Sequence, residues 1–580
     1  MKLVSVTVDR FHNFVSAQTT PIEDDVTCLV GKNESGKTTL LRALHRLRPA
    51  NGSGDELNFN LTLDYPRWRL ARDRRAEPAL ADAVKPISAK YLLDELDRTA
   101  LAEHLGFSTP EGTYAVASKS YSNKPSVSLG ADVADVLMSL AAESSVHEDD
   151  LKSLDTSSYT RLPDSIKERA KELKDAEALR SKAMTGLATS LAKQAVLFGA
   201  SALTQEAVNA VWNRLPKTFY FSSYDLLPGE CDLTELADKL AAGAALSSQE
   251  STAVALLRHA GEQPKDFLDE DYDSRKAELQ AASSDLTRHV FQYWRQNTDL
   301  EVIFDDDNVV IGNDAANQPI LHRILKIEIR DARHGGVETN FSTRSTGFQW
   351  FFSFFAAFSE FQGKKDPVIV LLDEPGTSLH GDAQSDFVRY VFTELGPAAQ
   401  TVYTTHSQHM VDPTKYEKLR AVHDRATREN PDLGVSVSTV SLSADRDTLL
   451  PVESALGYSV SQHLFLGSGH HLAVEGSSDF VYLMRLSEHV RATGGQGLDP
   501  RFSIIPVGGV DNMPAFVALM GRRLQVTALI DGASTSGKAD RVRAAARDNG
   551  MDDSVVVTCG VRGDALPANA DIEDLFSTAD

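Results

Sequence analysis

One short segment, residues 26–46 with the sequence VTCLVGKNESGKTTLLRALHR, limits what this chain can fold into. An apolar run ends at Gly31, a loop leads to Gly36-Lys37-Thr38, and leucines then recur at helical spacing. This pattern matches G-x-x-x-x-G-K-[ST], in which backbone N–H groups surround a polyphosphate and the next helix aims its positive dipole end at it. The segment therefore predicts a strand, a phosphate-binding loop and a helix within an α/β fold.

Each position of this loop has an expected role. Glycine is needed where a side chain would block the approach of the phosphates. Lys37 would neutralise the outer phosphates, and Thr38 would offer its hydroxyl to Mg²⁺. A chance glycine-rich turn is the alternative, but the strand before the loop and the helix after it argue against that. The predicted nucleotide-binding residues of the loop are Gly31, Asn33, Gly36, Lys37, Thr38 and Thr39.

Composition and charge exclude several classes of protein. The chain has 82 acidic and 59 basic residues, a net charge of −23, so any contact with DNA must come from local patches or through metal ions. The cysteines Cys28, Cys231 and Cys559 are far apart, which favours a reducing cytoplasm over a disulfide framework. No apolar run reaches the roughly 18 residues of a membrane span, and residues 1–14 lack the apolar core of a signal peptide. We therefore expect a cytoplasmic protein without a membrane partner.

Two segments around the loop carry further predictions. Residues 2–9 alternate apolar and polar side chains, so they should form a strand beside the one that ends at Val30. Residues 57–63 alternate in the same way and should form another strand. A basic cluster follows, either a solvated face or a contact to a DNA backbone or nucleotide. Its members are Arg67, Arg69, Arg72, Arg74 and Arg75.

The middle of the chain changes character. Residues 86–215 are rich in good helix formers and should be a helical insertion, structural or dimer-forming, that divides the nucleotide-binding fold into parts 1–85 and 216–450. Residues 217–227 should restore a core strand, and a second helical stretch should run over 233–294. Short strands are expected at 300–304 and 325–330.

The next chemistry lies in residues 341–355, FSTRSTGFQWFFSFF. A turn rich in Ser, Thr and Gly precedes a strongly apolar helix, which presents N–H groups and a hydroxyl at a helix N-terminus. A plain capped core helix is the alternative interpretation. Residues 367–373, PVIVLLD, predict a buried parallel strand that delivers Asp373 and Glu374 at its carboxyl end. The first carboxylate could hold Mg²⁺ and the second could orient the attacking water, since adjacent buried acids are costly without a cation.

A further buried strand, residues 400–405, ends at His406, which is either a core histidine or a contact to the terminal phosphate. The order of phosphate loop, serine-glycine turn, acidic strand end and histidine resembles ABC-type ATPases over most of residues 1–440. That resemblance implies ATP as the nucleotide, with Glu374, His406 and Lys37 as catalytic residues and Asp373 in its binding. It also implies a homodimer in which Ser345 and Gly347 act on the nucleotide of the other copy.

Residues 457–580 begin a different domain. Predicted strands at 471–475, 502–507, 526–530 and 554–558 alternate with helices, as in a small parallel sheet. Acidic residues follow these strands or lie in the loops beyond them, and carboxylates on one edge repel one another unless divalent cations bridge them. Such a cluster suits a one- or two-metal site acting on a phosphodiester. The predicted metal ligands there are Glu475, Asp479, Asp531 and Glu573.

This second arrangement resembles the Toprim domain. An ABC-type P-loop ATPase with an α-helical insertion, followed by a Toprim-like parallel α/β domain, resembles the OLD family of ATP-dependent nucleases, which includes the anti-phage Gabija nuclease subunit. The motifs that carry the resemblance are GKNESGKTT, STRSTGFQW, LLDEPGTSLH, TTHSQ, LAVEGSSD, IPVGG, LIDG and IEDLF. It implies ATP with Mg²⁺, a second site for Mg²⁺ or Mn²⁺, DNA as substrate, a homodimer or higher oligomer, and an accessory defence subunit.

Two departures from the family pattern keep alternatives open. Toprim domains usually carry Asp-x-Asp on the third strand, where this chain has Ala533, and the family usually continues past the point where this chain ends at Asp580. An ATP-regulated, metal-dependent DNA endonuclease is the first hypothesis. The second is an ATPase whose Toprim-like domain binds nucleic acid or a partner without cleaving. A DNA-clamping ATPase is the third, and it leaves the acids of the second sheet unexplained.

Overall fold

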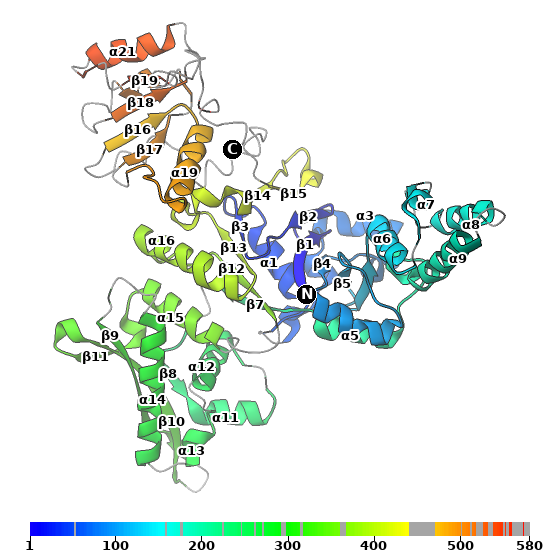
Figure 1. The fold of residues 1–580 in the computed structure, drawn as a ribbon. Coiled ribbons are helices and arrows are strands. Elements are labelled where there is room, and N and C mark those ends of the chain that lie inside the picture. The colour runs from blue at the N-terminus through cyan, green and yellow to red at the C-terminus, as the bar shows by residue number, and fades with distance from the viewer. Residues whose placement is uncertain are drawn as a thin grey trace. The chain divides into compact units, whose positions relative to one another are not determined.

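The computed structural model describes residues 1–439, 470–558 and 572, with internal gaps at 51–53, 145, 153, 157–158, 160, 174–177, 223–225, 245, 260–262, 270–271, 292–296, 298, 314–316, 360–366, 500–501, 508, 511–512, 515, 518–525, 532–536, 549–550 and 553–555. The chain divides into two compact units (Figure 1). The first unit is Met1–Met410 with Lys418–Thr439, and the second is Val411–Glu417 with Val440–Asp580. None of the described helices combines the length and apolar character needed to cross a bilayer.

The central sheet of the first unit has the strand order β15-β14-β3-β13-β12-β7, parallel except at β15. Its strands are β3 (Val26–Val30), β7 (Lys217–Ser222), β12 (Val368–Asp373), β13 (Thr401–Thr405), β14 (Leu419–Asp424) and β15 (Val435–Thr439). β3 and β13 are buried along their whole length, as strands covered on both faces must be. Burial raises the pKa of the Cys28 thiol on β3 to about 12. The strands predicted before Gly31 and at 217–227, 367–373 and 400–405 are confirmed as β3, β7, β12 and β13, with shorter bounds.

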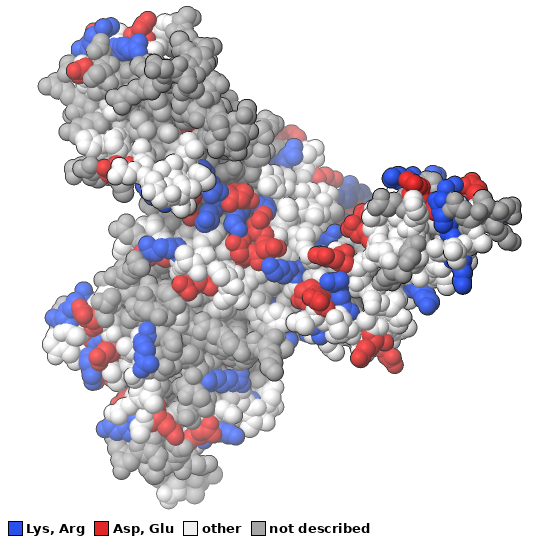
Figure 2. Space-filling model, viewed as in Figure 1, with Lys and Arg blue, Asp and Glu red and all other residues white. Residues whose placement is uncertain are grey.

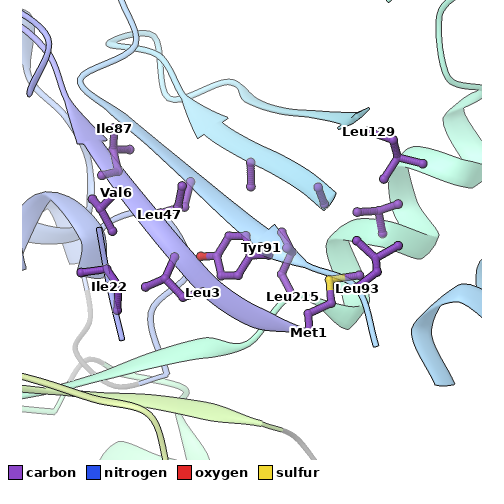
Figure 3. Close-up of a cluster of buried hydrophobic side chains, with 14 of the residues drawn as sticks. Met1, Leu3, Val6, Ile22, Leu47, Ile87, Tyr91, Leu93, Leu129 and Leu215 are labelled. Atoms are coloured by element: carbon purple, nitrogen blue, oxygen red, sulfur yellow. The ribbon is translucent and has the colours of Figure 1, made fainter. Parts of the chain in front are cut away.

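A separate antiparallel sheet packs beside it, in the order β2-β1-β4-β5-β6. Its strands are β1 (Lys2–Val8), β2 (Gln18–Pro21), β4 (Ile87–Leu92), β5 (Tyr114–Lys119) and β6 (Pro125–Gly130). The helix α1 (Lys37–His45) contacts both sheets, so it joins them into one core. Figure 3 shows part of that core, where Leu3, Val6 and Tyr91 are buried almost completely.

This sheet corrects two predictions. The strand at residues 2–9 forms but does not lie beside Val26–Val30, because β1 pairs with β2 and β4 instead. The segment 86–215 is only partly helical, since β4, β5 and β6 complete the antiparallel sheet. The helices described in this segment are α5 (Glu95–Leu105), α6 (Val133–Glu143), α7 (Glu148–Lys152), α8 (Leu162–Leu173), α9 (Ala178–Lys193) and α10 (Gln205–Arg214), with a 3₁₀ turn at Ala195–Phe198.

The strand predicted at residues 57–63 is wrong. A 3₁₀ turn (Gly54–Leu57) and the short helix α2 (Leu61–Asp64) occupy the segment. The Asn60 side chain accepts the N–H groups of Thr62 and Leu63, so it caps α2 and competes successfully with an extended backbone. The helices α3 (Arg67–Ala76) and α4 (Leu80–Ala83) follow.

The remaining part of the first unit contains a third sheet and its helices. The order is β11-β10-β8, with β9 also paired to β10, and the strands are β8 (Glu230–Asp232), β9 (Leu300–Asn313), β10 (Pro319–Asp331) and β11 (Val337–Asn340). The helices are α11 (Leu233–Ala241), α12 (Ser248–His259), α13 (Asp266–Asp269), α14 (Tyr272–Phe291), α15 (Thr346–Ser359), α16 (Gly381–Tyr390) and α17 (Gly396–Ala398), with a π-helical turn at Val391–Leu395. Short 3₁₀ turns lie at Ala332–His334, Phe341–Thr343, Gln408–Met410 and Pro431–Leu433. The predicted helical stretch and the two following strands are confirmed, with longer strands.

The second unit is built on a parallel sheet in the order β17-β16-β18-β19. The strands are β16 (His470–Val474), β17 (Phe502–Pro506), β18 (Val526–Ile530) and β19 (Val556–Thr558), the helices are α19 (Ser477–Ala492) and α21 (Lys538–Asp548), and a 3₁₀ turn lies at Pro413–Lys418. The parallel sheet predicted from the alternating pattern is therefore confirmed. Its core includes Ala473, Ile505 and Ala528 of the sheet and Val542 of α21.

Candidate nucleotide-binding site

The loop between β3 and α1 has the geometry of a phosphate-binding loop. Gly36 has φ 105°, a left-handed conformation that a side chain would strain, and α1 begins directly after it. A Cβ on Gly31 would come within 2.3 Å of the Val422 carbonyl oxygen. Both glycines are thus required by the backbone. Asn33 is exposed in the loop, and Thr39 is half-buried on α1.

Lys37 places a buried positive charge within this loop. Its ammonium donates to the carbonyl oxygens of Gly31 at 2.8 Å and Lys32 at 2.9 Å. The same nitrogen lies 3.2 Å from Glu374 Oε1, although the Lys37 side chain is only 4% exposed. A buried cation needs such partners. The same N–H groups of Lys37 could donate to the oxygens of a terminal phosphate.

Asp373, at the end of β12, collects hydroxyl groups from three other elements. Its Oδ1 accepts from Thr38 at 2.9 Å and from Thr404 at 2.9 Å, and its Oδ2 accepts from Tyr220 at 2.8 Å. Burial, together with the neighbouring Asp373 charge, raises the pKa of the Tyr220 hydroxyl, so it remains a donor. The register of β7, β12 and β13 brings these side chains together.

Glu374 and His406 form a pair at the ends of β12 and β13. His406 Nδ1 lies 2.7 Å from Glu374 Oε2, and the Glu374 N–H donates to Thr404 Oγ1 at 2.8 Å. Glu374 has φ 48°, which is uncommon outside glycine and occurs where surrounding contacts hold a functional side chain in place. The carboxylate is therefore aimed by its backbone, by His406 and by Lys37.

The residues of this site include ones that the sequence did not single out. Tyr220 lies in the middle of a core strand, and no pattern in the sequence shows that its hydroxyl reaches Asp373. Thr404 lies two residues before His406, and its place near the end of a predicted strand is the only sequence feature that could have marked it as a site residue. Gln384 on α16 is buried; its amide donates to the Gly376 carbonyl at 2.9 Å and its oxygen accepts from the Ser407 hydroxyl at 2.7 Å.

Gln384 therefore connects the turn after Glu374 to the residue after His406. We expect Gln384→Met, which keeps the length and removes both hydrogen bonds, to lower kcat for ATP hydrolysis about tenfold with little change in KM, because each bond contributes about 1 kcal/mol to the placement of its turn. Ser407→Ala, which removes one bond, should have a smaller effect. Steady-state hydrolysis measures both, with the exposed Gln205→Met as control. A variant that lost only thermal stability would contradict a positioning role.

The serine-glycine turn is confirmed in its structure and lies before α15. Ser345 is exposed, and its hydroxyl accepts from the Phe348 N–H at 3.4 Å, as in a helix cap. Gly347 is buried, and a Cβ there would come within 3.0 Å of the Ser378 carbonyl oxygen. The turn therefore packs on the segment after Glu374 and leaves Ser345 accessible to another surface.

The acids of the second unit are only partly brought together. Glu475 Oε1 accepts the Asp531 N–H at 2.9 Å, and Asp531 Oδ1 accepts the Ile572 N–H at 3.2 Å. Asp479 instead caps α19, accepting from the Gly476 N–H at 2.8 Å. Glu573 and Ala533 lie outside the described residues. Within the described part, no group of three or more His, Cys, Asp or Glu side chains is arranged around a metal position, so Glu475, Asp479 and Asp531 do not form such a group there.

The first-unit site suits a magnesium nucleotide. Thr38 Oγ1 and Asp373 Oδ1 are hard oxygen ligands 2.9 Å apart, the type that Mg²⁺ prefers, and the loop supplies N–H groups and an ammonium for phosphates. The described part of the second unit offers Glu475 and Asp531, which is a smaller set of the same ligand type.

Comparisons with known proteins give one family match and several distant structural likenesses. Residues 235–411 match the family model described as an AAA ATPase domain, a range that contains Ser345, Asp373, Glu374 and His406. No curated protein matches the sequence. Similar solved structures include an SMC head bound to the C-winged helix domain of ScpA (12% identity, 76% of this chain, 99% of that chain, TM-score 0.35) and the SMC head domain from Thermotoga maritima (12%, 76%, 100%, 0.30). Another is an SMC head with an extended coiled coil bound to the C-terminal domain of ScpA, derived from Pyrococcus furiosus (12%, 78%, 99%, 0.33).

These structural likenesses are too distant to bear on function. Residues 235–411 match an AAA ATPase domain, and the arrangement around Lys37 and Asp373 has the geometry of a P-loop nucleotide site.

Proposed function

We propose that this chain hydrolyses ATP in its first unit and, under control of that cycle, cleaves DNA at a metal site in its second unit, as OLD-type nucleases do. The observation that carries the ATPase half is the Thr38–Asp373 hydrogen bond beside the Lys37–Glu374–His406 group. These contacts join the phosphate loop to the ends of β12 and β13, which follow the loop by more than 300 residues in the sequence.

The residues of the first site divide the work of hydrolysis. Lys37 neutralises the phosphate that is transferred, and the N–H groups of the loop hold its neighbours. Thr38 and Asp373 would hold Mg²⁺, which supplies charge stabilisation to the leaving phosphates. Glu374 orients the attacking water and accepts its proton, while His406 fixes the carboxylate that does so. Ser345 and Gly347 would complete the site of a second copy in a homodimer.

The nuclease half rests on the carboxyl ends of β16 and β18. The Glu475–Asp531 contact supports a shared position for two carboxylates at one edge of a parallel sheet, where ligands of such sheets bind. A metal held there would activate water and stabilise the phosphate charge of a DNA backbone. Asp479 and Glu573 are proposed as further ligands, Mg²⁺ or Mn²⁺ as the ion, and anti-phage defence in the cytoplasm, with an accessory subunit, as the setting.

A nicking assay on supercoiled plasmid with Mg²⁺ or Mn²⁺ tests the nuclease half. We expect the wild type to produce nicked circles and Glu475→Ala to lose at least about tenfold in rate, because loss of one carboxylate weakens the metal and its water. Glu488→Ala, an exposed glutamate on α19, is the matched control. Cutting that survives Glu475→Ala would refute the proposed metal site.

A second candidate function follows from the position of Asp479. Because its carboxylate caps α19 and Ala533 replaces a usual acid, the second unit could bind nucleic acid or a partner without cutting it. A wild type that hydrolyses ATP and binds plasmid, yet leaves it supercoiled with either metal, would favour this candidate over the nuclease.

A further inference from the structure

The helix α3 (Arg67–Ala76) is unusual in this acidic chain. Its sequence RWRLARDRRA holds five arginines and one aspartate, and none of its residues is buried. Basic and acidic side chains are intermixed over the face of the molecule in Figure 2, which is typical of a solvated surface. Only Leu70 of α3 packs against the hydrophobic core, so polar contacts carry much of the attachment and their direction shows which side is left open.

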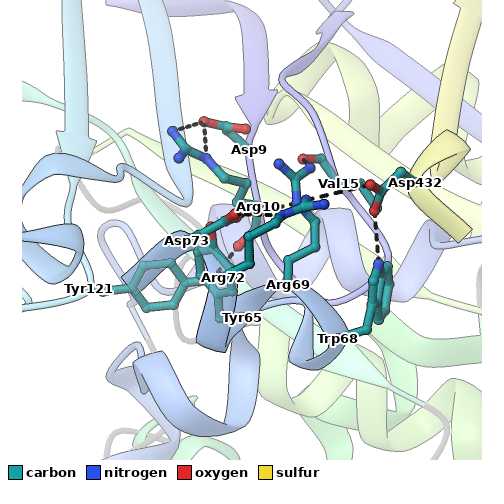
Figure 4. Close-up of polar contacts among 10 residues, drawn as sticks. All are labelled: Asp9, Arg10, Val15, Tyr65, Trp68, Arg69, Arg72, Asp73, Tyr121 and Asp432. Atoms are coloured by element: carbon teal, nitrogen blue, oxygen red, sulfur yellow. Dashed lines mark hydrogen bonds and ion pairs between the residues drawn. The ribbon is translucent and has the colours of Figure 1, made fainter. Parts of the chain in front are cut away.

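One side of α3 is fixed to the first unit, as Figure 4 shows. Arg69 donates to the Val15 carbonyl at 3.1 Å and pairs with Asp73, which accepts the Tyr65 hydroxyl at 2.6 Å. Trp68 Nε1 donates to Asp432 Oδ1 at 2.9 Å. Arg72 pairs with Asp73 at 3.2 Å, and its Nη2 lies 3.5 Å from Asp432 Oδ2.

The opposite side carries arginines without an acidic partner among the described residues. Arg67, Arg74 and Arg75 are spaced by seven and eight positions, so 3.6 residues per turn place them on one side of the helix. In the described part of the chain, Arg74 reaches the Thr62 hydroxyl, at 3.5 Å, and Arg75 the Ala71 carbonyl of its own helix. All three are exposed.

The loop that carries Asp432 contacts the anchored side of α3. Its exposed Arg425 and Arg428 stand among Asp424, Glu429 and Asp432, so the loop adds no net positive charge. We name the exposed arginines Arg67, Arg74 and Arg75 the α3 basic face. The contacts of Trp68, Arg69 and Asp73 hold the helix in place, and no ion pair joins the three arginines of this face to an acid of the described segments.

We infer that the α3 basic face binds the phosphate backbone of nucleic acid. Guanidinium groups contact phosphate oxygens with two parallel hydrogen bonds, and a chain of net charge −23 repels a polyanion except where a local cationic surface offsets that repulsion. The inference rests on the proposed function, in which DNA is the substrate. The α3 basic face would be the surface of the first unit that holds the duplex. An acidic protein segment is the competing occupant.

Fluorescence anisotropy with a labelled mixed-sequence duplex, over a series of NaCl concentrations, tests the inference on the full chain. The triple variant R67Q/R74Q/R75Q should bind at least about tenfold more weakly, and its slope of log K against log salt should be shallower by about 0.9 for each phosphate that the variant no longer neutralises. K171Q/K182Q/K193Q removes the same charge from exposed lysines on α8 and α9 and should bind as the wild type does. ATP hydrolysis without DNA should be unchanged in both.

The outcomes separate this inference from the proposed function. Equal affinity and slope for the α3 variant and the wild type would overturn the inference, while wild-type DNA binding and nicking would still support the function. A changed assembly mass in sedimentation with unchanged DNA binding would assign the face to a protein and also overturn it. If the triple variant melts early, the single variants R67Q and R74Q, each expected to reduce the slope by about 0.9, replace it.

Discussion

Replacing Lys37 with alanine should abolish ATP turnover, a loss of at least about 100-fold in kcat/KM. The Lys37 ammonium is the one cation that the structure places in contact with both the loop carbonyls and Glu374 among the described residues. Without it the transferred phosphate has no buried positive partner in the loop, because Lys32 is exposed. The Gly31 and Lys32 carbonyls also lose their donor, and Glu374 loses the charge that offsets its own.

Phosphate release under saturating ATP measures this loss. Lys182→Ala, which removes an exposed lysine on α9, should hydrolyse ATP at the wild-type rate and controls for a general effect of charge. A melting temperature near that of the wild type would show that Lys37→Ala is folded. Normal hydrolysis by the folded Lys37→Ala protein would refute the assignment of this loop.

Replacing Glu374 with glutamine should slow hydrolysis by about 10² to 10⁴-fold and leave ATP binding intact. Glutamine keeps the size of the side chain but cannot accept a proton from water. The binding groups Lys37, Thr38 and Asp373 remain, so the nucleotide should still be held. The change should therefore appear in kcat, and the trapped ATP state should favour the homodimer if Ser345 acts on a second copy.

Single-turnover hydrolysis together with equilibrium nucleotide binding separates the two effects. Glu394→Gln, an exposed glutamate after α16, is the matched control and should change neither. His406→Ala should lie between the wild type and Glu374→Gln, because it removes the partner that orients Glu374 rather than the base. Turnover by Glu374→Gln within a few-fold of the wild type would place the base elsewhere.

The site residues could be predicted where they belong to a short sequence motif whose residue types are required by the chemistry of the site. The glycines around residues 31–36 and the apolar strands ending at Asp373 and His406 can be identified from single segments, because the close approach of phosphates and the burial of parallel strands restrict residue types locally. Tyr220 and Gln384 could not be identified in this way. Their hydrogen bonds depend on which strands pair and where α16 packs, and neither residue belongs to a pattern.

The wrong predictions about the fold also arise because pairing between distant segments cannot be identified from one segment. Alternation in residues 2–9 identifies a strand but not its partner, so it does not show that β1 pairs with β4 rather than with β3. Alternation in residues 57–63 is outweighed by the Asn60 cap. Good helix formers after residue 86 conceal three strands, because pairing of β4 with β1, of β5 with β4 and of β6 with β5 can outweigh weak local preferences.

The sequence by itself determined that the chain has a nucleotide-binding loop and which strand ends carry the charged groups of the site. Both follow from glycine geometry and strand burial, which act over a few residues. Only the tertiary structure decided that Thr38, Tyr220 and Thr404 share Asp373, that Asp479 caps a helix, and that α3 turns three arginines outward. Those facts depend on contacts between segments far apart in the chain, and the free energy of such contacts cannot be read from either segment alone.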